Sequence, residues 1–173
     1  MAVNGKKKIL MLSDHALSTS GVGTQSRFLI NGLVDTGKYT FRQFGAAQKH
    51  TDYKVMKVNE DFIIKPTDGF GTPEMLRLAL ATEKPDLLLI FTDPRFFHWM
   101  YSMEDEVHQV CPIAYWHVWD NKPYPAFNDM YYEATDLLAC HSHHTYEQLV
   151  EKYPDKTHFV PHTVPEEVYF EFT

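Results

Sequence analysis

Hydrophobic residues along this chain follow two alternating patterns. Short runs dominated by apolar residues are typical of strands that are covered on both faces of a parallel sheet. These runs lie at residues 9–12, 86–91, 112–117 and 136–140. Between them, apolar residues recur at helical spacing, as they do over residues 21–34. The alternation predicts one doubly wound, mostly parallel α/β sheet of Rossmann-like type with helices on both faces.

Weaker signals complete the predicted order of elements. A second strand is expected at residues 39–46, a hairpin or bent strand at 54–65, and a last strand at 158–160. Thr72 followed by Pro73 predicts a helix start. Further helices are expected at 96–109, at 145–152 and, as a short piece, around 131–133. The whole chain, 1–173, is interpreted as one domain, with 161–173 beginning an interdomain linker.

The first strand, loop and helix carry the strongest candidate chemistry. Ser20 precedes Gly21, Val22 and Gly23, and Thr24 follows them at the predicted helix start. Two glycines let a ligand approach the backbone, and the free N–H groups at a helix N-terminus attract an anion. The pattern predicts a phosphate contact at Gly21, Val22, Gly23 and Thr24; the structural alternative is that the glycines only permit close packing.

Composition and net charge limit the classes of function that suit this chain. The 173 residues are 44% hydrophobic and carry a net charge of −7, which suits one packed domain and argues against nucleic acid as a partner. Two cysteines and the lack of a signal peptide or an apolar span favour the cytoplasm. The basic run Lys6-Lys7-Lys8 is interpreted as a solvated end, with weak contact to an anionic membrane surface as the alternative.

Ligands of open α/β sheets bind beyond the carboxyl ends of the strands. That rule places Asp14, Asp93, His117 and His141 along one rim. The neighbouring histidines His143 and His144 point apart on any regular element, and no cysteine or acid completes a standard site, so no metal is expected. Asp93 precedes a proline and can equally cap the next helix, and His117 can equally be a core histidine.

Other phosphate-binding motifs fit the chain less well. A dinucleotide fingerprint needs a third glycine, where this chain has Ser26, and an acid after the second strand, which is absent. A Walker-type loop needs lysine after the last glycine, whereas Gly23 is followed by Thr24. A phospho-receiver domain needs paired acids after the first strand and a lysine after a later one, and neither is present.

Four landmarks together resemble the N-terminal domain of GT-B-fold glycosyltransferases of the retaining group 1 type. The loop Ser20-Gly21-Val22-Gly23 is similar to that family's Gly-Gly-Val-Gly opening. The other landmarks are a strand ending in His with an acid soon after, a strand followed by Ser, and a closing phrase with Val-x-Pro and a later aromatic. Here they correspond to residues 113–120, to Ser142 after residues 137–141, and to residues 159–170.

The resemblance implies a function and a set of roles. The chain would be the acceptor-side half of an enzyme that transfers a sugar from a nucleotide-sugar donor to an acceptor hydroxyl, with the donor-binding C-terminal half outside this chain. Gly21 to Thr24 would contact a donor phosphate, and His117 would act on the donor sugar or the incoming hydroxyl. Acceptor hydroxyls would be held by Asp93 and Asp120, with Asp14 on the same rim and Trp116 opening an aromatic stretch suited to stacking on sugars.

The resemblance implies no resident cofactor. Two alternatives remain: a nucleotide-sugar epimerase of the same fold, and a non-catalytic module that binds a glycan or a partner protein.

Overall fold

A single eight-stranded sheet organises the chain in the computed structural model, which describes residues 5–47, 49 and 52–165. The strand order is β3-β4-β2-β1-β5-β6-β7-β8, and every pair is parallel except β3 with β4. The strands are β1 (Lys7–Asp14), β2 (Tyr39–Ala46), β3 (Met56–Lys57), β4 (Phe62–Pro66), β5 (Leu87–Phe91), β6 (Ile113–His117), β7 (Leu137–Cys140) and β8 (Thr157–Phe159). The predicted mostly parallel Rossmann-like sheet is confirmed, as is the antiparallel hairpin.

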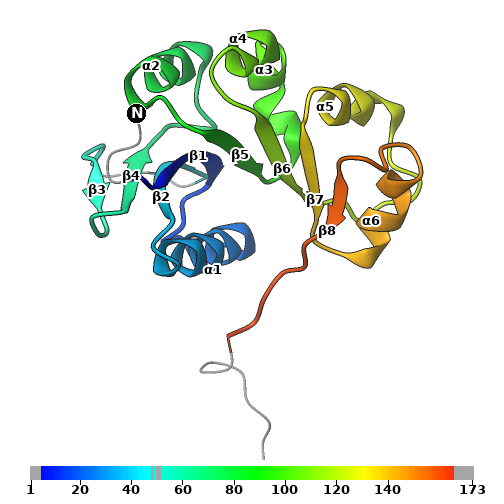
Figure 1. Cartoon of the computed structure of the whole chain (residues 1–173), viewed down its shortest axis with the longest axis horizontal. Helices are drawn as coiled ribbons and strands as arrows, with labels where there is room; N and C mark the ends of the chain where they lie inside the picture. Colours follow the sequence, from blue (N-terminus) through cyan, green and yellow to red (C-terminus); the bar gives the residue numbers. More distant parts are fainter. Residues whose placement is uncertain (1–4, 48, 50–51, 166–173) are drawn as a thin grey trace, which may run out of the picture.

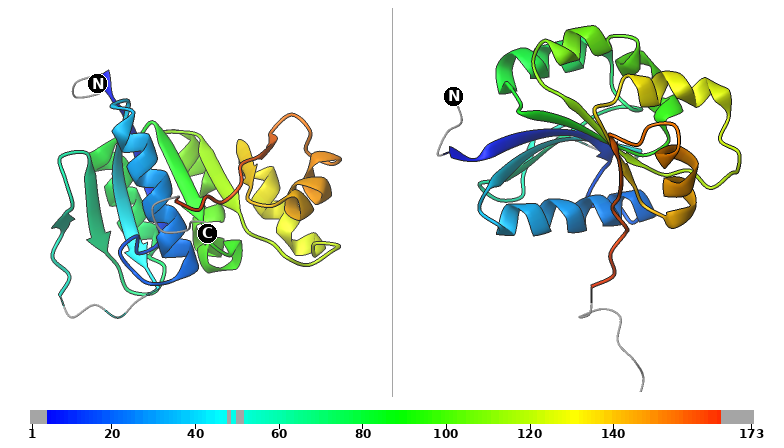
Figure 2. Two further views of the ribbon diagram at one scale, coloured as in Figure 1. Left: turned by 90° about the horizontal axis from the view of Figure 1, so that it is seen from below. Right: turned by 45° about the vertical axis from the view of Figure 1, so that its right-hand side comes forward.

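Helices cover the sheet on both faces (Figure 1). Helix α1 (Gly21–Asp35) runs along one face, as the left view of Figure 2 shows, and the helices from α2 to α5 lie on the other. Helix α6 packs at the β8 end of the sheet. The bounds of the helices are α2 (Pro73–Glu83), η2 (Pro94–Phe97), α3 (His98–Tyr101), α4 (Glu104–His108), η3 (Ala126–Asn128), α5 (Asp129–Glu133) and α6 (His143–Val150).

The two sheet faces build two separate apolar cores. Alternate residues of a strand point to opposite faces, so Leu88 and Ile90 of β5 join the core under α2 to α5, whereas Leu89 and Phe91 join the core under α1. Ile30 is fully buried and anchors α1 to the sheet. Both faces of the central strands are thus apolar, which explains the unbroken hydrophobic runs in the sequence.

Side-chain caps set where the longer helices begin. The hydroxyl oxygens of Ser20, Thr72 and Ser142 each accept a hydrogen bond from a backbone N–H three residues on, at α1, α2 and α6 respectively. Pro73 occupies the first turn of α2 as predicted, and Lys84 ends that helix in the left-handed conformation.

The single helix predicted over residues 96–109 is wrong. The segment instead forms η2, α3 and α4, with a break at Ser102 and Met103. Phe97, Met100 and Tyr101 share one helical stripe, and Met103 lies off it. With this break, the side chains of Met103 and Val107 both pack in the core under α2 to α5. The Ser102 hydroxyl donates a hydrogen bond to the carbonyl oxygen of His98, one turn back.

The chain after β8 crosses the edge of the sheet as a strap, residues 160–165. The carbonyl of Val160 accepts a hydrogen bond from the Trp116 indole, and Thr163 exchanges two hydrogen bonds with the Gln25 side chain of α1. His162 packs edge-on against Phe91 and Trp116. The rest of the predicted linker, 166–173, lies outside the described residues.

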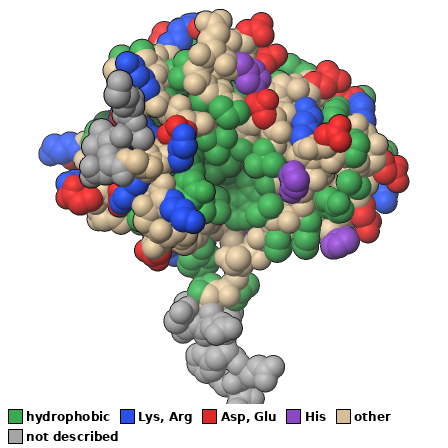
Figure 3. All heavy atoms as spheres, viewed as in Figure 1, with side chains coloured by type: hydrophobic (Ala, Val, Ile, Leu, Met, Phe, Trp, Pro, Cys, Tyr) green, Lys and Arg blue, Asp and Glu red, His purple; other side chains and the backbone are tan. Residues whose placement is uncertain are grey.

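Beside α1, none of the described helices lies directly over the sheet face formed by β5, β6 and β7 (Figure 1), although Leu89, Ala114 and Ala139 on this face are at most 8% exposed. Figure 3 shows hydrophobic side chains gathered in a hollow in the middle of this face, between α1 and α6. The small side chains of Ala114 and Ala139 belong to this face, and Leu137 is 39% exposed at its border. This is an apolar surface on a parallel sheet, a type of sheet that normally has both faces covered.

The basic run near the N-terminus is held by carboxylates. The pairs are Lys6–Asp61, Lys7–Asp86 and Lys8–Glu83, with N–O distances of 2.6, 2.8 and 3.2 Å. Among the helices of the described residues, none combines the length and the apolar character that crossing a membrane requires.

Candidate functional site

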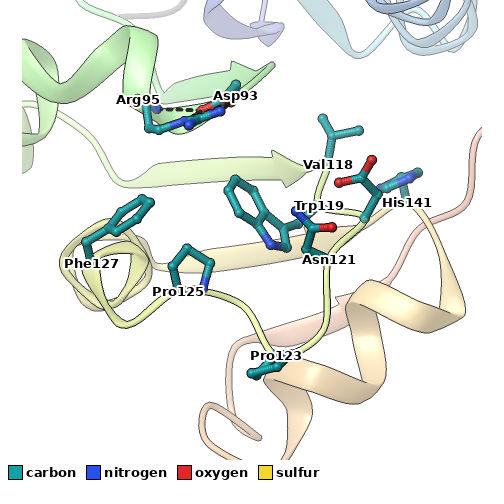
Figure 4. A pocket seen from close by; sticks show the side chains of 10 residues that line it. Asp93, Arg95, Val118, Trp119, Asn121, Pro123, Pro125, Phe127 and His141 are labelled. Atoms are coloured by element: carbon teal, nitrogen blue, oxygen red, sulfur yellow. Dashed lines mark hydrogen bonds and ion pairs between the residues drawn. The ribbon is translucent and has the colours of Figure 1, made fainter.

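A pocket of about 680 Å³ lies at the carboxyl ends of β5, β6 and β7 (Figure 4). Its volume is in the range of small-molecule sites, and its place is where open α/β sheets bind ligands. Its polar lining residues are Asp93, Arg95, Asp120, Asn121 and His141, and its apolar ones are Val118, Trp119, Pro123, Pro125 and Phe127.

One wall of the pocket is an ion pair fixed by a tight turn. The Asp93 carboxylate caps η2 by accepting from the Arg95 backbone N–H, and it also accepts a bifurcated hydrogen bond from the Arg95 Nε, which lies 2.9 and 3.0 Å from its two oxygens. Burial raises the pKa of the Asp93 carboxyl, but the hydrogen bonds from Arg95 outweigh this and hold that pKa below its ordinary value. Asp93 is therefore ionised at neutral pH, and the structure places it both as the cap of η2 and among the residues that line the pocket.

The floor of the pocket is an aromatic stack over His117. The guanidinium of Arg95 lies 5.6 Å from the ring centre of Trp119, and the Trp119 ring stacks on the His117 imidazole. His117 is 1% exposed, and its Nε2 lies 2.8 Å from the Tyr132 hydroxyl. Burial lowers the pKa of His117 to about 3, with the neighbouring His141 adding to the effect. This imidazole is neutral at pH 7 and is not among the side chains that line the pocket.

The histidine that lines the pocket is His141, not His117. Its Nδ1 lies 2.7 Å from the carbonyl oxygen of His117, one strand away. Its ring also packs against His162 of the strap, with ring centres 4.6 Å apart. Burial and the nearby His141 lower the pKa of His162 to about 4. The two contacts hold the His141 ring at the end of β7.

The glycine loop forms a second polar feature of the same edge, at the neighbouring strand β1. The N–H of Gly23 donates to the Ser20 hydroxyl and that of Thr24 to the Ser20 carbonyl, so both are occupied. The N–H groups of Gly21 and Val22 have no hydrogen-bond partner within the described part of the chain. Two of the four predicted donors thus stay free for an anion at the positive end of a 15-residue helix.

Asp14 lies at this helix start and opposes an anion there. Its carboxylate accepts a hydrogen bond of 2.8 Å from the Ser20 hydroxyl, and the residue is 8% exposed. Burial raises the pKa of the Asp14 carboxyl, and the bond from Ser20 offsets this only in part. A phosphate at Gly21 and Val22 would lie near this carboxyl, and an ionised carboxylate there would repel it.

Gly21 and Gly23 differ in the space that a side chain would find at each position. A Cβ on Gly23 would lie 2.6 Å from the His15 carbonyl oxygen and 2.3 Å from the Ser18 hydroxyl, so Gly23 is required by packing. A Cβ on Gly21 would meet nothing within 4 Å. The structural alternative therefore holds for Gly23, whereas the surroundings of Gly21 are open to a ligand.

The predicted site residues fall into three groups. Asp93 and Asp120 lie together in the pocket, and Asp14 lies with Gly21 to Thr24 at the helix start. Trp116 does not line the pocket: it is 4% exposed, belongs to the core on the α1 face, and donates its indole N–H to Val160. Sequence reasoning did not assign Arg95 a role, although an Asp-Pro-Arg turn directly after a buried strand is a signal for it.

Taken together, the strands, helices and pocket define a Rossmann-like α/β domain with a pocket at the carboxyl edge of its sheet. Comparison of the chain with protein-family models and with curated protein sequences gives no match. Within the described residues, no three His, Cys, Asp or Glu side chains are placed to hold a metal ion.

Proposed function

We propose that this chain is the acceptor-side half of a retaining, group 1 type glycosyltransferase of the GT-B fold, transferring a sugar from a nucleotide-sugar donor to an acceptor hydroxyl. The observation that carries the proposal is that one sheet edge bears both a helix start with two free N–H donors and a separate polar and aromatic pocket. The donor-binding half would come from a second domain or polypeptide.

The two features divide the work of transfer. Departure of a nucleoside diphosphate builds negative charge, and the N–H groups of Gly21 and Val22 at the α1 N-terminus are suited to stabilise it. The acceptor would lie in the pocket beside β1, where Asp93 and Asp120 offer carboxylates to its hydroxyls. Trp119 and Phe127 supply apolar surface for the ring of a sugar. His117 serves as a neutral support beneath Trp119 rather than as a group that touches substrate.

The test is transfer by the native protein that contains this chain, supplied with radiolabelled UDP-glucose, UDP-N-acetylglucosamine, GDP-mannose or ADP-glucose and a panel of saccharide acceptors. Three proteins are compared: wild type, Gly21→Ala and Gly21→Pro. Proline is tolerated at the first helical position, and Ser20 before it is already extended, with φ −67° and ψ 153°. Only proline removes the N–H group.

We expect Gly21→Pro to lower kcat/KM about tenfold or more, the loss of one charge-assisted hydrogen bond, and Gly21→Ala to leave it near the wild-type value. Equal activity of the two variants would overturn the role of the helix start. If none of the donors is consumed but a saccharide still binds, the transferase proposal is wrong and the alternative, a non-catalytic glycan-binding module, takes its place.

A further inference from the structure

His141 has a fixed proton position. Its Nδ1 is 2.7 Å from the carbonyl oxygen of His117, and a carbonyl oxygen can only accept a hydrogen bond. The Nδ1 therefore carries a proton, and in the neutral ring Nε2 is a bare acceptor. This Nε2 forms no hydrogen bond to any described residue.

The ring of His141 is held in place on two sides. Besides the bond to the His117 carbonyl, one side of the ring is covered by His162, with ring planes 33° apart. His162 is in turn held by its contacts to Phe91 and Trp116 and by the strap bonds at Thr163. An acceptor atom whose orientation is set before binding loses little freedom when a ligand arrives.

The polar groups of the pocket favour a ligand that donates hydrogen bonds. Asp93 and Asp120 contribute two carboxylates against one guanidinium, Arg95, which leaves a net charge of −1 on these three side chains. Arg95 is already engaged by Asp93 and by Trp119. Asp120 has no hydrogen-bond or ion-pair partner among the described residues. A carboxylate or phosphate on the ligand would meet this net negative charge, whereas hydroxyl groups would find free acceptors.

The dimensions of the pocket suit a sugar ring. Figure 4 shows His141 on one side and Phe127 on the opposite side, with Trp119 between them. A volume of about 680 Å³ accommodates one or two pyranose rings, and the aromatic surfaces lie beside the polar groups rather than apart from them.

From this geometry we infer that His141 binds a hydroxyl group of a neutral saccharide through its Nε2 atom, and that the pocket selects neutral over anionic sugars. The inference rests on the proposed function, because it names the class of acceptor for that same site. The hydroxyl donates to Nε2, and no covalent step at the histidine is required.

The test compares variants that distinguish the role of the His141 Nδ1 atom from that of its Nε2 atom. In His141→Asn the amide can still donate to the His117 carbonyl but nothing replaces Nε2, whereas in His141→Gln the amide reaches toward the Nε2 position. His144→Asn is the matched control, because His144 is an exposed neighbour on α6. Binding of methyl glucoside, methyl galactoside, methyl mannoside, N-acetylglucosamine, glucuronate and glucose 6-phosphate is measured by titration calorimetry and NMR.

We expect at least one neutral sugar to bind the wild type and the His144→Asn variant equally, and to bind His141→Asn about tenfold more weakly, as for one lost hydrogen bond. The His141 Nε2 resonance of the wild type should shift on binding, a measurement that needs no variant. Undiminished binding by His141→Asn, an unmoved resonance at saturating sugar, or tighter binding of the two anionic sugars would each overturn the inference.

The experiments distinguish an error in the role of His141 from an error in the proposed transferase function. If the native protein transfers a sugar and its His141→Asn variant is fully active, the transferase proposal stands and the role of His141 is wrong. If neutral sugars bind through His141 but no nucleotide sugar is turned over, the role of His141 stands and the transferase proposal is wrong.

Discussion

The Trp119 indole lies across the His117 imidazole, with ring centres 6.4 Å apart and 23° between the ring planes. The Nδ1 atom of His117 is buried without a hydrogen-bond partner among the described residues. A buried polar atom without a partner is costly, and this one lies under the floor of a pocket. Trp119 therefore separates the histidine from any ligand and helps to keep it neutral.

Removal of that cover should change the titration of His117. We expect Trp119→Ala to raise the pKa of His117 from about 3 toward its ordinary value of 6.5, by about one unit or more, because water then reaches the ring. Trp119→Phe keeps an aromatic cover and is the control. NMR titration of the imidazole resonances measures the effect, and a pKa that stays below 4 in the alanine variant would contradict it.

The glycine loop gives a prediction on stability. Gly23→Ala should lower the free energy of unfolding by about 1–3 kcal/mol, because its Cβ would lie 2.6 Å from the backbone oxygen of His15. Gly21→Ala should change it by less than about 0.5 kcal/mol, or raise it slightly, since the Cβ would meet open space and alanine favours the helix. Urea unfolding of both variants decides the matter, and equal values would contradict it.

Local signals explain why much of this fold could be predicted. Residues 39–46 were predicted as a strand and form β2 with the same bounds, and the helix start predicted at Thr72 and Pro73 is where α2 begins. These features depend on neighbours in sequence. The break at Met103 depends instead on which core that side chain reaches, which periodicity alone does not reveal.

The candidate site was only partly predictable for the same reason. His117 ends β6 and His141 directly follows the neighbouring strand β7, and His117 pairs with Cys140, one residue before His141. Which of the two faces the pocket is decided by Trp119 folding back over His117 and by the strap holding His141, and both are tertiary contacts. Trp116 was predicted to bind substrate, but strand alternation directs it to the α1 face, opposite to Tyr115.

Buried histidines make stability depend on pH. The pKa values of His117 and His162 are lowered to about 3 and about 4, so both stay neutral in the folded chain while the unfolded chain takes up protons below its ordinary value of 6.5. Stability is therefore fully present above about pH 6.5 and falls as the pH decreases from there to about 4 for His162 and to about 3 for His117. For His117 the expected slope is about 1 kcal/mol per pH unit between pH 6 and 4.

Substitution identifies the source of this pH dependence. His162→Gln should flatten part of the decline, because glutamine does not titrate, and His158→Gln on the exposed end of β8 is the matched control. Urea unfolding at several pH values between 7 and 4 provides the comparison. A curve for His162→Gln that runs parallel to the wild type throughout would show that His162 does not contribute.

Glu83 joins the end of α2 to the sheet through three cations. Its carboxylate lies 3.2 Å from the Lys8 ammonium, 3.4 Å from the Arg42 Nε and 2.7 Å from the Lys65 ammonium, and its side chain is only 16% exposed. Burial raises the pKa of the Glu83 carboxyl, but the bonds from Lys65 and Lys8 outweigh this and lower that pKa overall. We expect Glu83→Gln to destabilise the fold by about 1–3 kcal/mol, because three partly buried cations then lack their counter-charge.

Glu60 provides the matched control for that change. It pairs with Lys57 at 2.5 Å, but its side chain is 86% exposed, so Glu60→Gln should alter stability by less than about 0.5 kcal/mol. Because the Glu83 carboxyl has a lowered pKa, its contribution is present above the ordinary carboxyl range and is lost as the pH falls through the folded-state value. The difference between wild type and Glu83→Gln should therefore shrink in acid. A difference that persists unchanged at pH 3 would mean that packing, not charge, makes Glu83 necessary.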